Sequence, residues 1–416
     1  MKFISKYKTY LTFTLSSSIY NIVLIATNFI AIKWIQPKDI GLWNSVFLYS
    51  NYIALMQLGV FNTINRDIPF YYGKNEIDKV KKIVEVGSWF ARFLFLINIF
   101  FTLFILIYLF LTHKSIELKI TALSIGLITA LSFYQNFLIV TYRTSSQFNK
   151  LANVYLSQSI IVVLSLFLVV QWSYYGFVLR NLILIFFFSF FAYKNRPFKL
   201  KPIFDKKIFI NLLKVGVLFY IVIYAINITS TFARLFLLNH TGIKEVGLFF
   251  PAIGVIMGME LIPSSISQII YPKLSYEVGK SSGNERLFSI FIRSSLLTLI
   301  LLSIIAALIY FLFPLIILRY FPLYSESIDA VKYSAIAGIF TSGIIYSILL
   351  SQKKWKLLYS TALLKLLIFG FLIDYFIKNT TSAITGAAKG WLISNIIFYF
   401  IIFFLILYTL KKNESY

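Results

Sequence analysis

The chain has 416 residues, of which 59% are hydrophobic and only 13% are charged, and its formal net charge is +24. A soluble domain carries about twice that share of charged residues, so the composition excludes a water-soluble globular protein and indicates an integral membrane protein. The absence of cysteine excludes disulfides and thiolate metal sites, and His113 and His240 stand too far apart to suggest a metal cluster. We therefore expect no metal and no cofactor.

Twelve apolar stretches follow one another, each about long enough to cross a bilayer as a helix. The first follows a basic N-terminus and continues to about Ile35 without a cleavage site of small residues, so we interpret it as an uncleaved membrane helix. We interpret QWSYYG at 171–176 as a turn, because one longer helix would not fit the bilayer. The predicted helices are 10–35, 41–65, 87–112, 118–141, 151–173, 176–193, 208–237, 244–271, 287–314, 327–350, 356–377 and 384–410.

The lysine and arginine residues outside these helices are distributed unevenly. With the N-terminus in the cytoplasm, the cytoplasmic segments hold 24 of the 39 basic residues and the outer segments hold 7. Because cytoplasmic loops are enriched in lysine and arginine, this distribution predicts a multi-pass protein with both termini in the cytoplasm. It also accounts for most of the positive charge, which we expect to face anionic membrane lipids rather than nucleic acid.

A short motif occurs twice, 206 residues apart. PKDIGLW at 37–43 and IKEVGLF at 243–249 share a lysine, an acidic residue, a β-branched residue, glycine, leucine and an aromatic residue in the same order. Both copies enter predicted helices from the outer side, so they have the same orientation. We therefore predict two parallel six-helix halves, 1–193 and 208–416, related by a pseudo-twofold axis along the membrane normal and joined by the basic cytoplasmic linker 194–207.

Ionisable residues inside membrane helices are costly, and they usually line a cavity or pair with each other. Basic residues outnumber acidic ones in the predicted helices, which favours an anionic cargo such as a phosphate or pyrophosphate. Two similar halves around a polar interior are typical of transporters, and a scaffold protein with the same duplication is the structural alternative. The charged candidates for substrate binding are Arg92, Arg180, Arg234, Arg293 and Lys365.

Glu260 and Lys365 fall near the middle of their predicted helices, so they have a functional role or form a static pair that joins two helices. A carboxylate at this depth is expensive unless it is paired, hydrated or protonated. Glu260, together with Asp374, is therefore the candidate for coupling to a proton or sodium gradient. Arg92 and Arg293 lie one to two turns inside the cytoplasmic boundary, where extension to the interface is the alternative to ligand contact.

Neutral amides add to the polar character of the second predicted helix. Asn44 and Asn51 stand seven residues apart and therefore near one helical face. Such amides suit a hydroxyl-rich cargo such as a sugar, and they also join membrane helices by hydrogen bonds. Both residues are candidates for substrate binding.

Three stretches carry a resemblance to a known family. QLGVFNTINRDIPFYYGKNE at 57–76, FARLFLLNHTGIKEVGLFFPA at 232–252 and IYPKLS at 270–275 resemble segments of the Wzx-type O-antigen flippases. These belong to the multidrug/oligosaccharidyl-lipid/polysaccharide (MOP) exporter superfamily. The family often has an acidic residue before the arginine of the second stretch, whereas this chain has Ala233 before Arg234.

The resemblance implies a V-shaped bundle in the bacterial inner membrane that flips undecaprenyl-pyrophosphate-linked oligosaccharide from the cytoplasmic to the periplasmic leaflet. It implies alternating access driven by a proton or sodium gradient, with the polysaccharide polymerase machinery as a partner in O-antigen and lipopolysaccharide biosynthesis. Such a protein is not an enzyme.

Four other functions can be compared with the features of the sequence. A flippase for capsule or exopolysaccharide units would share every feature above. A multidrug exporter of the same superfamily usually carries cations, which a basic interior disfavours. A peptidoglycan-precursor flippase typically has two further helices. An O-antigen polymerase or ligase usually needs a large periplasmic loop, whereas every predicted outer loop here is short, and no nucleotide-binding GxxxxGK[ST] motif occurs.

Overall fold

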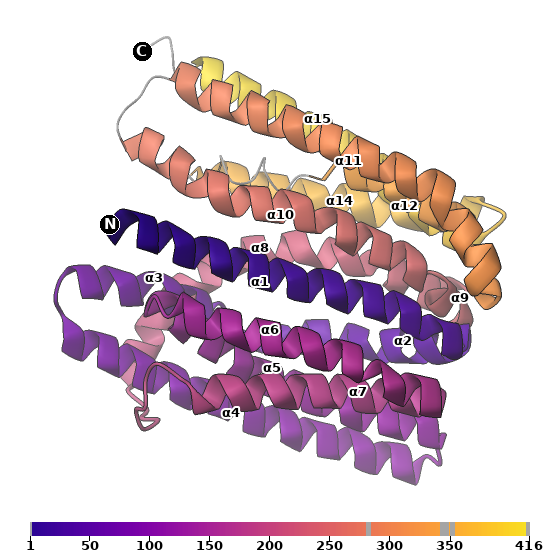
Figure 1. Cartoon of the computed structure of the whole chain (residues 1–416), viewed down its shortest axis with the longest axis horizontal. Coiled ribbons are helices and arrows are strands. Elements are labelled where there is room, and N and C mark those ends of the chain that lie inside the picture. Colours follow the sequence, from indigo (N-terminus) through magenta and orange to yellow (C-terminus); the bar gives the residue numbers. More distant parts are fainter. Residues whose placement is uncertain (1, 280–283, 342–348, 350–353, 413–416) are drawn as a thin grey trace. The chain divides into compact units, whose positions relative to one another are not determined.

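The computed structural model describes residues 2–279, 284–341, 349 and 354–412, and the described residues form helices joined by short turns (Figure 1). They divide into two compact units: unit 1 is Met1–Ile35 with Val46–Tyr224, and unit 2 is Gln36–Ser45 with Ala225–Tyr416. The division therefore runs through two helices, α2 (Pro37–Ile53) and α8 (Lys206–His240). The predicted halves placed their boundary in the linker 194–207 instead, and their superposition remains a prediction.

Unit 1 is built on a buried cluster of aliphatic and aromatic side chains, with Phe133, Phe188 and Ile64 among its fully buried members. Within it, α4 packs along α5, α1 along α6, and α5 along α7. Besides its parts of α2 and α8, its elements are α1 (Lys2–Ala31), η1 (Ile32–Trp34), η2 (Ala54–Gln57), α3 (Val60–Gly73), α4 (Ile77–Leu111), α5 (Ile116–Thr144), α6 (Phe148–Leu164) and α7 (Leu166–Lys194).

Unit 2 packs its helices around α12 and α15. In it, α14 lies along α15, and α12 contacts α10, α11 and α15. Besides its parts of α2 and α8, its elements are α9 (Ile243–Leu248), α10 (Phe250–Gly279), α11 (Asn284–Tyr320), η3 (Pro322–Ser327), α12 (Ile328–Ile339), α14 (Trp355–Asn379) and α15 (Ala383–Lys412).

Eight helical stretches in the described part of the chain are long and apolar enough to cross a membrane. They coincide with the predicted helices that begin at 10, 87, 118, 176, 244, 287, 356 and 384. This confirms an all-helical, multi-pass membrane protein. Two of the other four predicted helices match α2 and α6, which have 17 residues each, the lower limit of about 17 for a span. A third matches α8, and the fourth, 327–350, extends beyond the described residues, so the count of twelve remains a prediction.

The second predicted helix, 41–65, is interrupted in the structure. Leu58 and Gly59 both have positive φ, at 46° and 71°, and they separate η2 from α3. A Cβ at Gly59 would lie 2.1 Å from the backbone oxygen of Gly216 in α8, so a side chain is excluded there. The apolar pattern of the sequence continues through this point. Hydropathy does not depend on backbone dihedral angles, so the pattern could not reveal the interruption.

The predicted turn at 171–176 is confirmed. Ser173, with φ 50° and ψ −121°, breaks the helical path inside α7. A Cβ at Gly176 would lie 1.9 Å from the carbonyl oxygen of Leu168, so the chain reverses sharply around Ser173. The hydroxyl of Ser173 donates a hydrogen bond to the carbonyl of Trp34 in the same unit.

The two copies of the repeated motif contact each other within unit 2. A Cβ at Gly41 would lie 1.8 Å from the carbonyl oxygen of Ile243, and a Cβ at Gly247 would lie 1.7 Å from that of Pro37. Since Gly247 is 206 residues after Gly41 and Ile243 is 206 residues after Pro37, each copy makes the same contact with the other. Such reciprocity is the signature of a twofold relation, and it explains why glycine stands in both copies.

Candidate functional site

Lys365 lies on the side of α14 that faces the protein. Leu358, Ala362, Phe369 and Ile373 are buried and follow the helical spacing of Lys365. The opposite side of the helix consists of exposed hydrophobic side chains, spaced four residues apart, that suit lipid contact: Leu363, Leu367, Phe371 and Tyr375. The half-buried Lys365 ammonium group therefore points away from the expected lipid surface.

Lys365 has aromatic and acidic neighbours inside unit 2. Its Nζ lies 5.2 Å from the ring centroid of Phe369 and 5.7 Å from that of Phe398 in α15, which are cation–π distances. Glu260 in α10 is close enough to interact electrostatically with Lys365. Glu260 is exposed at the surface of unit 2, whereas Lys365 is half-buried.

Arg234 in α8 is a buried cation. Its exposed fraction is 5%, and its Nε atom has no hydrogen-bond partner among the described residues. No charged side chain in the described part of the chain acts on it electrostatically. A buried charge is strongly destabilising unless something compensates it, so this position suits an anion that arrives from outside the chain.

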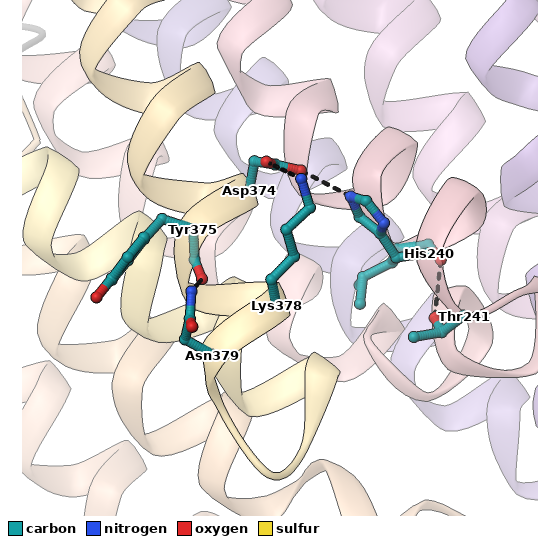
Figure 2. A network of polar contacts seen from close by, with 7 residues as sticks. His240, Thr241, Asp374, Tyr375, Lys378 and Asn379 are labelled. Carbon is teal, nitrogen blue, oxygen red and sulfur yellow. Dashed lines mark hydrogen bonds and ion pairs between the residues drawn. The ribbon is translucent and has the colours of Figure 1, made fainter.

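The end of α8 meets α14 at a polar network (Figure 2). His240 Nε2 lies 2.7 Å from one carboxylate oxygen of Asp374, and the Nζ atom of Lys378 lies 2.6 Å from the other. Sequence reasoning assigned no role to His240, because nothing in the sequence indicates a contact across 134 positions. Both oxygens of Asp374, the second predicted ion-coupling residue, are thus occupied by basic side chains, and its role in coupling stays a prediction.

The contact between His240 and Asp374 is a common reference point for the depths of Arg234 and Lys365 along their helices. Further inward, the ring of Phe232 in α8 lies 3.7 Å from where a Cβ of Gly370 in α14 would be, so the two helices approach each other at a second point and run in the same direction. At a rise of 1.5 Å per residue, Arg234 is about 9 Å and Lys365 about 14 Å inward from the His240–Asp374 contact. Lys365 therefore lies about one helical turn further inward than Arg234, on a different helix of unit 2.

Arg180 belongs to unit 1 and is fully enclosed there. Its exposed fraction is 0%, and its guanidinium donates hydrogen bonds of 2.6 Å to Asn28 Oδ1 and 2.7 Å to Thr27 Oγ1, both in α1. Its Nε atom has no partner among the described residues, and Tyr20 is near enough to act on it electrostatically. Neutral oxygens thus hold this charge in place between α7 and α1.

The other predicted binding residues are separated from this arrangement. Arg92 is exposed on α4 in unit 1, and Arg293 is exposed on α11 in unit 2. Asn44 is buried and donates to the carbonyl of Ile40 in its own helix, at 2.9 Å. The backbone carbonyl of Asn51 accepts from the hydroxyl of Tyr224 in unit 1. The structure thus brings Lys365 and Glu260 together in unit 2, places Arg234 on the helix beside Lys365, and leaves the rest apart.

No protein-family model and no curated protein sequence matches this chain. Solved structures do match it. An inward-facing multidrug resistance MATE family transporter of the MOP superfamily superposes with a TM-score of 0.68 at 14% identity, covering 95% of this chain and 96% of that one. An outward-facing structure described in the same terms gives 0.66 at 14% identity, with 99% and 97% covered.

A third similar structure is a MOP superfamily transporter from Pyrococcus furiosus, in which a reversed polarity of the binding pocket suggests a different function. Its TM-score is 0.63 at 15% identity, covering 98% of this chain and 96% of that one. These comparisons establish the fold: the chain has the helical fold of MOP superfamily transporters. The three similar structures named above are transporters.

Proposed function

We propose that this protein is a flippase that moves an anionic lipid-linked oligosaccharide, an undecaprenyl-pyrophosphate-linked O-antigen unit, from the cytoplasmic to the periplasmic leaflet of a bacterial inner membrane. The observation that carries the proposal is Arg234, a buried arginine without an acidic partner in the described part of the chain. Lys365 also supports the proposal, because it is a second cation in unit 2 and lies on the side of α14 that faces the protein.

The charge of this region distinguishes the cargo classes. A carrier of cationic drugs needs acidic side chains where the cargo binds, whereas unit 2 holds two cations, Arg234 and Lys365, and one carboxylate, Glu260, that acts on Lys365. A pyrophosphate matches this excess, because arginine donates two parallel hydrogen bonds to phosphate oxygens and lysine adds a point charge. The similar Pyrococcus transporter with reversed pocket polarity offers a parallel within the same fold.

In this proposal the protein works by alternating access. The sugar would be recognised by neutral polar groups, and a proton or sodium ion would supply the energy. The polymerase that consumes the flipped unit would act after it. A capsule or exopolysaccharide unit carries the same pyrophosphate lipid, so it is the closest alternative cargo, and a multidrug substrate is the alternative that the basic residues disfavour.

The proposed function predicts where lipid-linked repeat units collect when the protein is missing. In a deletion strain, we expect these units to accumulate on the cytoplasmic leaflet, protected from a sugar-oxidising or lectin probe added to the periplasmic side. Re-expression of the chain should return them to the accessible leaflet. Normal surface polysaccharide in the deletion strain would contradict the flippase assignment. If expression of the chain also leaves a drug-sensitive host as sensitive to cationic dyes as before, the drug-exporter alternative is excluded as well.

Glu260→Gln tests ion coupling, because glutamine keeps the shape of the side chain and cannot be charged. We expect flipping by this variant in proteoliposomes to lose its response to an imposed pH or sodium gradient. The matched control is Glu326→Gln, which neutralises an exposed glutamate that lies 3.8 Å from Lys244 in the same unit. If Glu260→Gln lowers heat stability yet keeps the full gradient response, Glu260 and Lys365 form a static pair instead.

A further inference from the structure

A pocket that none of the functions above uses lies in unit 1, on the side predicted to face the cytoplasm. It is formed by α4, α5 and the chain segment that follows α7. The side chains that matter for its chemistry are Ser88, Arg92, Tyr134, Thr141, Arg196 and Phe198. Two of them are arginines, and no aspartate or glutamate lines the pocket.

The predicted cytoplasmic linker is what closes this pocket. The linker packs against α4: the backbone N–H of Ile203 donates to the carbonyl of Glu85 at 3.4 Å, and the Phe204 ring lies 4.4 Å from the ring of Trp89. This packing brings Arg196 over the pocket. There its guanidinium lies 3.9 Å from the centroid of the Tyr193 ring and donates to the Tyr193 carbonyl at 3.0 Å.

The polar groups of the pocket suit a phosphate. Arg92 is exposed, with its guanidinium carbon 6.0 Å from the centroid of the Tyr134 ring. Arg196 is half-buried, and its hydrogen bond to the Tyr193 carbonyl uses only one of its five donors. Two guanidinium groups with free donors, at a pocket whose lining residues include no carboxylate, are an arrangement that suits a phosphodiester.

An apolar surface continues from this pocket toward the membrane centre. Leu96, Phe100 and Leu103 follow Arg92 by four, eight and eleven residues, so they share its face of α4. Their exposed fractions are 64%, 66% and 53%. If a molecule binds its anionic headgroup at the two arginines, its hydrocarbon tails can therefore lie along this exposed apolar face of α4, which extends from the arginines toward the membrane centre.

We propose that the mouth of this pocket binds the headgroup of an anionic phospholipid of the cytoplasmic leaflet, with the phosphodiester between Arg92 and Arg196 and the acyl chains along α4. Basic pockets at the cytoplasmic ends of membrane helices bind such headgroups. The site is independent of the proposed cargo, because it lies within unit 1 and uses none of the side chains assigned to the cargo in unit 2. It also gives Arg92 a role other than cargo binding.

The test is native mass spectrometry of the purified full chain, titrated with phosphatidylglycerol. The pocket variant is Arg92→Gln with Arg196→Gln. The control variant is Lys82→Gln with Lys199→Gln, which removes the same charge from exposed positions on α4 and on the linker. We expect the pocket variant to bind phosphatidylglycerol about tenfold or more weakly, and the control variant to bind it like the wild type. The melting temperatures of both variants in detergent should match that of the wild type.

Three further titrations separate the possible ligands. Phosphatidylcholine, which has the same tails and no net charge, should bind the wild type and the pocket variant equally weakly. Inorganic phosphate should not displace phosphatidylglycerol, because it lacks the tails. If both double variants bind phosphatidylglycerol equally weakly, the binding depends only on the general surface charge, and the proposal is overturned. Tighter binding of undecaprenyl phosphate than of phosphatidylglycerol would also overturn it, by making the pocket an entry point for cargo.

Discussion

Replacing Arg234 with lysine is expected to impair export of the lipid-linked oligosaccharide strongly while leaving the protein in the membrane. Lysine keeps the positive charge but lacks the planar fork that donates two parallel hydrogen bonds to a phosphate. Hydrogen bonds to charged groups contribute about 1.5–3 kcal/mol, so the loss of one should slow flipping by about ten- to a hundredfold. The measurement is the initial rate of flipping in proteoliposomes, together with surface polysaccharide in cells.

Two controls accompany this variant. Arg319→Lys makes the same exchange at an exposed position at the end of α11 and should leave transport unchanged. Lys365→Ala should also impair export, whereas Lys356→Ala, at an exposed position near the start of the same helix, should not. Wild-type flipping in both Arg234→Lys and Lys365→Ala, at normal protein levels, would remove these two residues from the cargo site.

The second large effect is expected at the crossing of the two motif copies. In Gly41→Ala and in Gly247→Ala, the new methyl group would lie within 1.8 Å of a backbone carbonyl oxygen, which cannot rotate away as a side chain can. Overpacking of this kind costs about 1–3 kcal/mol or more. We therefore expect each variant to lower the melting temperature in detergent and the amount of folded protein in the membrane.

Helical glycines of α10 provide the matched comparison for this prediction. A Cβ added at Gly254 or at Gly258 would meet no atom within 4 Å. Because alanine favours a helix over glycine by about 1 kcal/mol, Gly254→Ala and Gly258→Ala should leave stability unchanged or raise it. If Gly41→Ala and Gly247→Ala behave like these two, the motif copies do not approach each other as closely as described.

Much of the fold could be predicted because membrane helices are set by local composition. Long apolar stretches require helices, since no water satisfies the backbone in the bilayer, and this predicts α4, α5, α11, α14 and α15 to within a few residues at most ends. The interruption at Leu58 and Gly59 could not be predicted in the same way. It depends on backbone dihedral angles and on a contact with Gly216, and neither alters the hydropathy of the segment.

The candidate site shows the same limit. Depth along a helix follows from sequence position, so Lys365 and Glu260 could be predicted to lie at one level. Partners come from tertiary packing: Arg180 meets Thr27 and Asn28 more than 150 residues away, and Asp374 meets His240 across 134 residues. A single sequence gives no signal for such pairs. The arginines of the lipid pocket, Arg92 and Arg196, were likewise visible only as separate basic residues.

The reciprocal contact between the motif copies limits how the two halves of the chain can change over evolutionary time. Gly41 faces the backbone of the second copy, and Gly247 faces the backbone of the first. A larger side chain in either copy could be accommodated only by moving a main chain, and no substitution elsewhere supplies that movement. At this crossing, the backbone of each copy of the motif leaves room only for glycine in the other copy.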